Sequence, residues 1–240
     1  MVPIFCMACL VQPPQMPSGL SSEKWSVRAE AELQSKNWQA LNSTSLIFTK
    51  EHSSNGRAWG YLAISLLGLD RPAEAELALE TGIKAEPTFL GNWYNLGLVR
   101  CQLNRPPDSI KACLDELVRL SPESALQFSK DKRISEAISI PSEILVDMGK
   151  LDFDKYPSKK LNQYPPYPPE AKIRRVQGTV WVDLIVDASG RTISVGSTDG
   201  PSLLIQPALL CAIQTRFPPL IREGLPRAYK LTYGIPFRLR

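Results

Sequence analysis

Between residues 22 and 123 the apolar side chains recur at helical spacing in three successive blocks. In each block two apolar stripes are separated by a short polar segment, which predicts two helices joined by a tight turn. Trp25, Trp59 and Trp93 occupy matching positions in the blocks and lie 34 residues apart, so we interpret the blocks as a structural repeat. One helix pair cannot bury its apolar stripe alone, whereas three stacked pairs can. The tryptophans therefore predict packing positions and carry no chemistry of their own.

The residues around these tryptophans resemble the tetratricopeptide repeat (TPR) family over residues 22–123. The small, apolar and proline positions of that repeat are matched by Leu62, Ala63, Ala75, Leu79, Pro87, Leu96, Gly97, Ile110, Leu114, Leu117 and Pro122. In this family the first helix of each pair lines a concave groove that binds peptides. The resemblance places Arg57, Ile64, Tyr94 and Leu98 in such a groove. A scaffold or spacer without a peptide site is the alternative interpretation.

After the repeats the pattern weakens. Apolar residues at helical spacing predict a helix that caps the array, so we place the helical domain at residues 22–140. Pro141 interrupts this pattern, and we interpret residues 141–163 as a linker. The proline cluster that follows, residues 164–169, stiffens the chain because each proline fixes its own φ and restricts the residue before it. We therefore expect a second domain at residues 164–240.

Within this second domain a clean alternation of apolar and other residues runs from Gly178 to Asp187, which predicts a half-buried strand. A turn signal follows, and the next strand points Ile193 and Val195 inward. Residues 203–216 have the pattern of an amphipathic helix, and apolar residues alternate again from residue 229 to residue 239. With a short helix that begins at Pro169, the order is helix, β-hairpin, helix, strand. The fold class is thus an all-α helical-hairpin array followed by a small α+β domain.

This order of elements also predicts a sheet topology. The second helix carries the chain back along the sheet, so the third strand should run antiparallel to the first and pair beside it. The resulting strand order is 2-1-3, with the third strand at an edge. Pro236 supports this position, because proline is tolerated at sheet edges and avoided in central strands. An open edge invites pairing with another chain, and Lys230 and Arg238 would make such pairing selective.

Several short motifs follow in order those of the TonB C-terminal domain family, and residues 164–240 resemble it without large gaps. The motifs are Pro166-x-Pro168, Glu170-Ala171, Gly178-Thr179-Val180, Asp187-x-x-Gly190, Ser197-x-x-Gly200, Ala208-Leu209, Arg216-Phe217-x-Pro219, Gly224-x-Pro226 and Pro236-Phe237-Arg238-Leu239. The resemblance implies a non-catalytic periplasmic domain whose last strand pairs with a short receptor peptide, the TonB box. That is strand addition.

The resemblance also assigns the partner-binding residues. They are Tyr167 and Pro168 in the Tyr-Pro segment, and Arg227, Ala228, Tyr229, Lys230, Thr232 and Arg238 along the last strand. An outer-membrane TonB-dependent receptor is the implied partner, and a homodimer through the same edge is the alternative. For Tyr167 the resemblance leaves a second role open, because this side chain could equally anchor the segment to the domain's own sheet.

Charge is unevenly distributed along the chain. Residues 159–240 hold 4 Lys and 8 Arg against 2 Glu and 3 Asp, a net charge of +7, whereas the preceding residues sum to −3. A basic module favours an acidic protein face or an anionic surface. We predict no nucleic-acid partner, because these charges are scattered and form no dense patch with stacking aromatic residues. No stretch reaches the ~20 apolar residues needed to span a bilayer, so we predict no transmembrane helix.

The first 20 residues form an apolar leader followed by a breaker rich in Pro, Gln and Ser. They are typical of a signal peptide except that no Lys or Arg precedes the apolar run, so a truncated export signal or a hydrophobic tail is the alternative. Cys6 and Cys9 lie inside this leader, and a lipid anchor at Cys9 is disfavoured. Export predicts a periplasmic location, where Cys101 and Cys113 could form a disulfide. Two packed free thiols are the slightly favoured alternative.

Signals for catalysis are poor. The single histidine, His52, lies in a polar turn without metal-ligand spacing, and no nucleophile elbow, phosphate loop or dinucleotide motif occurs. Asp183 and Asp187 could pair as carboxylates, but the second belongs to a turn. We therefore predict no enzyme activity, no metal and no cofactor. The sequence predicts a periplasmic protein-interaction protein that binds a partner peptide, with a self-associating scaffold as the alternative.

Overall fold

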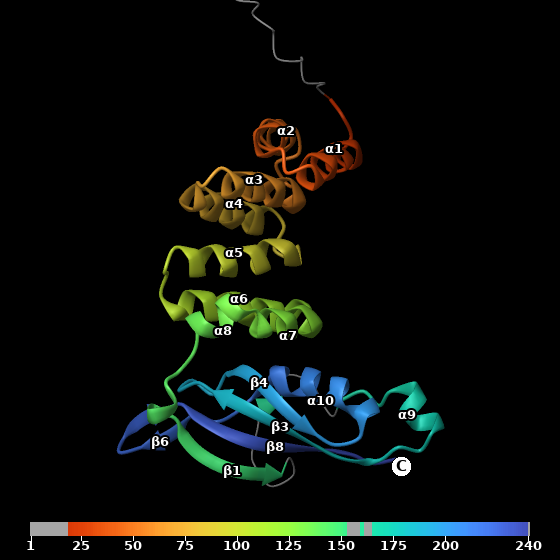
Figure 1. Cartoon of the computed structure of the whole chain (residues 1–240), viewed down its shortest axis with the longest axis vertical. Helices are drawn as coiled ribbons and strands as arrows, with labels where there is room; N and C mark the ends of the chain where they lie inside the picture. The colour runs from red at the N-terminus through yellow and green to blue at the C-terminus, as the bar shows by residue number, and fades with distance from the viewer. Residues whose placement is uncertain (1–18, 153–158, 161–164, 240) are drawn as a thin grey trace, which may run out of the picture.

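Stacked helix pairs stand on a small β-sheet domain in the computed structural model (Figure 1). The structure describes residues 19–152, 159–160 and 165–239, so the leader with Cys6 and Cys9 lies outside the described residues. The three predicted helix pairs are present as α1 (Ser22–Gln34) with α2 (Trp38–Glu51), α3 (Gly56–Gly68) with α4 (Pro72–Ala85), and α5 (Leu90–Gln102) with α6 (Pro107–Leu120). Two shorter helices, α7 (Pro122–Lys130) and α8 (Lys132–Ala137), follow them.

The tryptophans of the second and third repeats are held in the same way. The indole Nε1 of Trp59 donates to Ser53 O, and that of Trp93 donates to Pro87 O, each at 2.8 Å and each six residues upstream. In the first repeat Trp25 is fully buried and its Nε1 donates instead to a Glu51 carboxylate oxygen at 2.8 Å. The shared bond explains how a fixed period in sequence becomes a repeated packing geometry.

The array ends in a tightly packed cap. At Gly97 of α5 an added Cβ atom would lie 2.3 Å from the ring of Phe128 in α7, so only glycine permits this approach. Phe128 is fully buried and stacks edge-on against Tyr94, with ring centroids 5.3 Å apart. α7 therefore seals the third repeat, in the region where the sequence predicts a capping helix.

The C-terminal domain is a four-stranded sheet covered on one face. Its strands are β1 (Val146–Asp152), β3 (Gly178–Val186), β4 (Thr192–Asp199) and β8 (Tyr229–Phe237). The short helix α9 (Pro169–Ile173) precedes β3, and α10 (Ser202–Gln214) packs on the face that is turned toward the array (Figure 1). Small elements complete it: the 3-10 turn η1 (Ser142–Ile144), β2 (Lys159–Lys160), β5 (Thr215–Arg216), β6 (Leu220–Arg222) and β7 (Leu225–Arg227).

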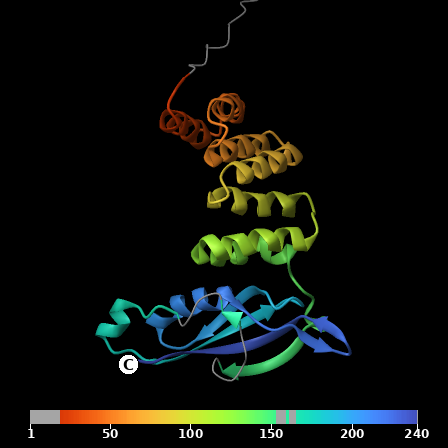
Figure 2. The same ribbon diagram turned by 180° about the vertical axis from the view of Figure 1, so that it is seen from behind.

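Strand order in the sheet is β1-β8-β3-β4. The predicted order of the hairpin and the last strand is confirmed, since β3 lies between β4 and β8 and is antiparallel to both. The prediction that the last strand is an edge is wrong, because β1 runs parallel to β8 along its other side. β1 comes from the segment interpreted as a linker, and Figure 2 shows it at the outer margin of the sheet from behind.

Array and sheet are joined by a continuous apolar core, in which α7 packs against both β4 and α10. A cluster of charges reinforces this contact. Asp115 of α6 accepts from Arg191 at 2.6 Å and also pairs with Arg216, both of which belong to the sheet domain. Lys111, one turn before Asp115, lies 3.8 Å from the Asp187 carboxylate. The array is thus seated directly on the C-terminal domain.

Candidate peptide-binding site

The outer backbone edge of β8 is the surface that strand addition requires, and β1 follows it in parallel. The paired residues run from Val146 with Tyr229 to Asp152 with Gly234, and Val146 N donates to Ala228 O at 3.1 Å. The register shifts between Asp147 and Lys150, where the strand bulges. This edge therefore accepts an extended segment, and in the described structure the segment belongs to the same chain.

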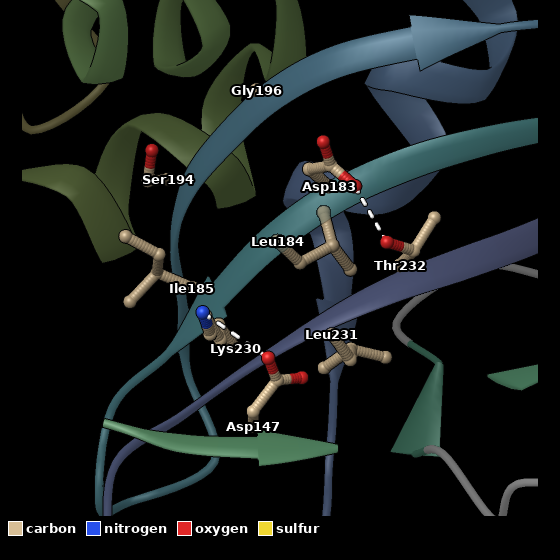
Figure 3. Close-up of a pocket in the computed structure, with 9 residues that line it drawn as sticks. All are labelled: Asp147, Asp183, Leu184, Ile185, Ser194, Gly196, Lys230, Leu231 and Thr232. Carbon is tan, nitrogen blue, oxygen red and sulfur yellow. Dashed lines mark hydrogen bonds and ion pairs between the residues drawn. The ribbon is translucent and has the colours of Figure 1, made fainter. Parts of the chain in front are cut away.

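The outer face of the sheet carries a shallow groove beside this edge (Figure 3). Its volume is about 430 Å³. Lys230 Nζ lies 3.1 Å from the Asp147 carboxylate, and the Thr232 hydroxyl donates to Asp183 at 2.7 Å. The two contacts link β8 to its neighbours on either side. The groove thus places carboxylates and the Lys230 ammonium group beside the backbone edge of β8.

Alternation along β8 divides the predicted strand residues between two faces. Tyr229 is fully buried, and its hydroxyl donates to Pro218 O at 3.2 Å, so its side chain cannot contact a partner. Lys230 and Thr232 lie on the outer face beside the groove. Arg227 belongs to the hairpin of β6 and β7, where it lies 3.8 Å from Glu223. The predicted residues thus converge on the edge only in part.

The Tyr-Pro segment has a structural role in its own domain. The Tyr167 hydroxyl donates to the Val176 carbonyl, and its ring packs edge-on against Phe237 with centroids 5.8 Å apart. Pro168 is the N-cap residue of α9, and Arg238 is an exposed residue directly after β8. These two contacts anchor Tyr167 to its own domain, which is the second role that the sequence leaves open for this side chain.

The predicted groove residues of the array are spread over different contacts. Arg57 lies over the Phe89 ring at 5.8 Å and 3.8 Å from Glu30, and Ile64 packs against the core of the first two repeats. Tyr94 packs on α7, as described above. Leu98 lines a cavity of about 650 Å³ between α5 and α8, whose other lining residues include Arg133 and Glu136. Leu98 therefore opens onto a cavity of the array, whereas the contacts of the other three are with neighbouring side chains.

The residues that the sequence raised as candidates for catalysis have structural contacts. Asp187 accepts from Ser189 N, Ser189 Oγ and Arg191 N at 2.6–3.1 Å, which fixes the turn between β3 and β4. His52 ends α2, and its Nε2 lies 2.9 Å from Leu20 O. Over the described ranges no group of three His, Cys, Asp or Glu side chains could hold a metal ion. These contacts give each residue a structural partner.

Cys101 and Cys113 are not joined by a disulfide. Cys101 is half-buried and Cys113 is buried. Burial raises the pKa of the Cys113 thiol to about 11. The array thus holds packed thiols, the alternative that the sequence slightly favoured. Within the described residues no helix is both long and apolar enough for a membrane span.

Comparison with known proteins gives a family match for the C-terminal third of the chain. Residues 163–239 match the family model described as Gram-negative bacterial TonB protein C-terminal. The TonB protein of Vibrio cholerae serotype O1 (strain ATCC 39315 / El Tor Inaba N16961) is 36% identical over 77 residues, or 31% of this chain and 32% of that protein. This chain therefore spans about a third of the length of the curated relative that it matches.

Solved structures similar to the helical half include the TPR2B domain of yeast Sti1 in its pHsp70 complex. It has a TM-score of 0.44 and 16% identity over 48% of this chain and 94% of that domain. PcrH from Pseudomonas aeruginosa has a TM-score of 0.45 and 13% identity over 52% of this chain and 99% of its own. The chain carries a TonB C-terminal domain at residues 163–239, preceded by helix pairs whose 34-residue tryptophan interval resembles the tetratricopeptide repeat.

Proposed function

We propose that this chain is a non-catalytic protein-interaction protein of the bacterial cell envelope, whose TonB-like domain binds a partner peptide by strand addition along β8. The observation that carries the proposal is the parallel pairing of Val146–Asp152 with this strand, because it demonstrates a backbone edge able to hold an extended segment. Main-chain hydrogen bonds would supply affinity, and the groove beside Lys230 and Thr232 would supply selectivity.

The partner is proposed to be the TonB box of an outer-membrane TonB-dependent receptor, and the location the periplasm. Support comes from the match of residues 163–239 to the TonB C-terminal family. Residues 159–240 carry a net charge of +7, which suits an acidic peptide or an acidic receptor face. In this proposal the helical array holds the domain in place, and the cavity beside Leu98 is a second peptide site.

Self-association is the second candidate function. It is favoured by the exposed position of β1 at the sheet margin, since a strand pairing with β8 of its own chain could pair equally with β8 of a second copy. Measuring the mass of the full chain in solution over a range of concentrations separates the two candidates. A monomer at every concentration contradicts self-association.

Isothermal titration of the full chain with synthetic TonB-box peptides tests the leading proposal. We expect at least one peptide to bind, while a peptide of the same composition in scrambled order does not. Lys230→Glu should weaken the binding of acidic peptides relative to that of uncharged ones, because Lys230 is a cation of β8 beside the edge. Leu77→Glu, on the solvent side of α4 where Leu77 is 64% exposed, is the matched control and should leave binding unchanged. Absence of binding across the whole panel would contradict the proposal.

A further inference from the structure

β1 lies where the proposed function puts the partner peptide. It pairs with Tyr229–Gly234, while the described part of the pairing does not extend to Ile235, Pro236 and Phe237. In the chain it follows α8 after a short connection, and β3 follows it only after the α9 segment. β1 is thus an addition from outside the helix, hairpin, helix and strand that make up the predicted domain.

The hold of β1 on the sheet is weak compared with that of its neighbours. No side chain of β1 is buried over residues 146–151, whereas Tyr229, Leu231 and Tyr233 of β8 are at most 3% exposed. Gly149 adopts φ +63° at the bulge, and its N–H donates to the Asp147 side chain at 2.9 Å. A bulged, half-exposed strand makes fewer contacts than a regular one, so it opens at lower cost.

Side chains of β1 nevertheless form an ordered pattern on the two faces of the sheet. Val146, Met148 and Leu151 pack against the apolar core. On the opposite face the Asp147 carboxylate meets Lys230 at 3.1 Å, as Figure 3 shows, and Lys150 Nζ lies 5.4 Å from the centre of the Trp181 ring. A segment paired with β8 in the way that β1 is paired therefore places three apolar side chains against the core and one carboxylate beside Lys230.

We propose that β1 is an internal competitor for the partner peptide. It covers the β8 edge in the free chain, and an extended partner segment displaces it by pairing in the same parallel direction. The favoured partner carries apolar residues at the positions of Val146, Met148 and Leu151 and a carboxylate at the position of Asp147. The proposal rests on the strand-addition function proposed above.

Binding of two labelled peptides tests the proposal by fluorescence anisotropy. One peptide has the sequence of residues 145–152, and the other is the best TonB-box peptide from the titration above. Each is added to the full wild-type chain and to the chain with Val146→Ser and Leu151→Ser, which removes apolar contacts of β1 and leaves β8 intact. Because apparent affinity scales with the fraction of chains whose edge is open, we expect both peptides to bind the variant about tenfold more tightly.

Two controls accompany the measurement. Ile144→Ser changes the same kind of residue two positions before the ladder, where Ile144 is 61% exposed, and should bind like the wild type. Hydrogen exchange at residues 229–234 should quicken in the double variant and slow again when peptide is bound. A circular dichroism spectrum that matches the wild type establishes that the double variant is folded.

Charge selection is tested with a peptide that carries Asp147→Lys. We expect it to bind the double variant about threefold more weakly than the unchanged peptide, since an exposed ion pair contributes little. Adding Lys230→Glu to the double variant should reverse that preference. If the two peptides bind equally well to both proteins, the proposed carboxylate selection is wrong.

The outcomes separate the two proposals. Equal affinity of the TonB-box peptide for wild type and folded double variant overturns the internal competitor and leaves strand addition standing. Failure of every TonB-box peptide to bind either protein overturns the function proposed above, and the competitor proposal with it. Binding of the TonB-box peptide to the variant without binding of the residue 145–152 peptide overturns the inferred partner pattern.

Discussion

Asp115 contacts two arginines of the sheet domain from the helical array, and its removal should lower stability measurably. It accepts from Arg191 at 2.6 Å and pairs with Arg216, and the three side chains are 20–30% exposed. Shielded hydrogen bonds to charged groups contribute about 1.5–3 kcal/mol each, whereas fully exposed ion pairs contribute about 0–1 kcal/mol. For two partly exposed pairs we expect Asp115→Ala to lower the free energy of unfolding by about 2 kcal/mol.

Urea unfolding, followed by both circular dichroism and tryptophan fluorescence, measures this change. Asp108→Ala on the same helix is the matched control, because the Asp108 side chain is 92% exposed and should contribute less than about 0.5 kcal/mol. In ~1 M salt the Debye length falls to about 3 Å, so the effect of Asp115→Ala should shrink. Equal losses for the two variants, or a loss at Asp115 that is insensitive to salt, would refute the electrostatic explanation.

Three further changes test the packing of the array. Trp59→Phe removes the bond to Ser53 O and should lower the urea-measured unfolding free energy by about 1 kcal/mol; an unchanged value contradicts this. Gly97→Val crowds the Phe128 ring and should cost about 3 kcal/mol, seen as a lower Tm; a wild-type Tm would be contrary evidence. With its pKa raised to about 11, Cys113 should resist maleimide at about pH 8 unless urea is present, as peptide mass spectrometry reports; rapid native labelling argues against burial.

Periodicity in the sequence predicts most of the fold because the responsible contacts are local. The 34-residue interval of Trp25, Trp59 and Trp93 becomes three helix pairs, and each indole N–H is held by an acceptor nearby in the sequence: Glu51, Ser53 O and Pro87 O. The alternation from Gly178 onward becomes β3, whose Val180 and Val182 are fully buried. Hydrophobic periodicity indicates which face of a helix or strand is buried, but it does not indicate which other element buries that face.

β1 was not predicted, because nothing in its local sequence requires this segment to be a strand. Its sequence contains a glycine at the bulge and lacks strict alternation, so the segment has the composition of a linker. It becomes a strand by pairing with β8, which lies about 80 residues later in the chain, and that partnership leaves no periodic trace. The same limit applied to the site: the order of the elements and Pro236 predict that β8 is an edge, but they do not predict that β1 pairs with it.

Backbone amide shifts of the isotope-labelled full chain, recorded while a TonB-box peptide is added, test the central claim most directly. Strand addition along β8 predicts shifts concentrated at residues 228–234, together with shifts at residues 146–152 as β1 gives way. Shifts confined to the cavity beside Leu98, or a spectrum that stays unchanged for every peptide tested, would contradict it.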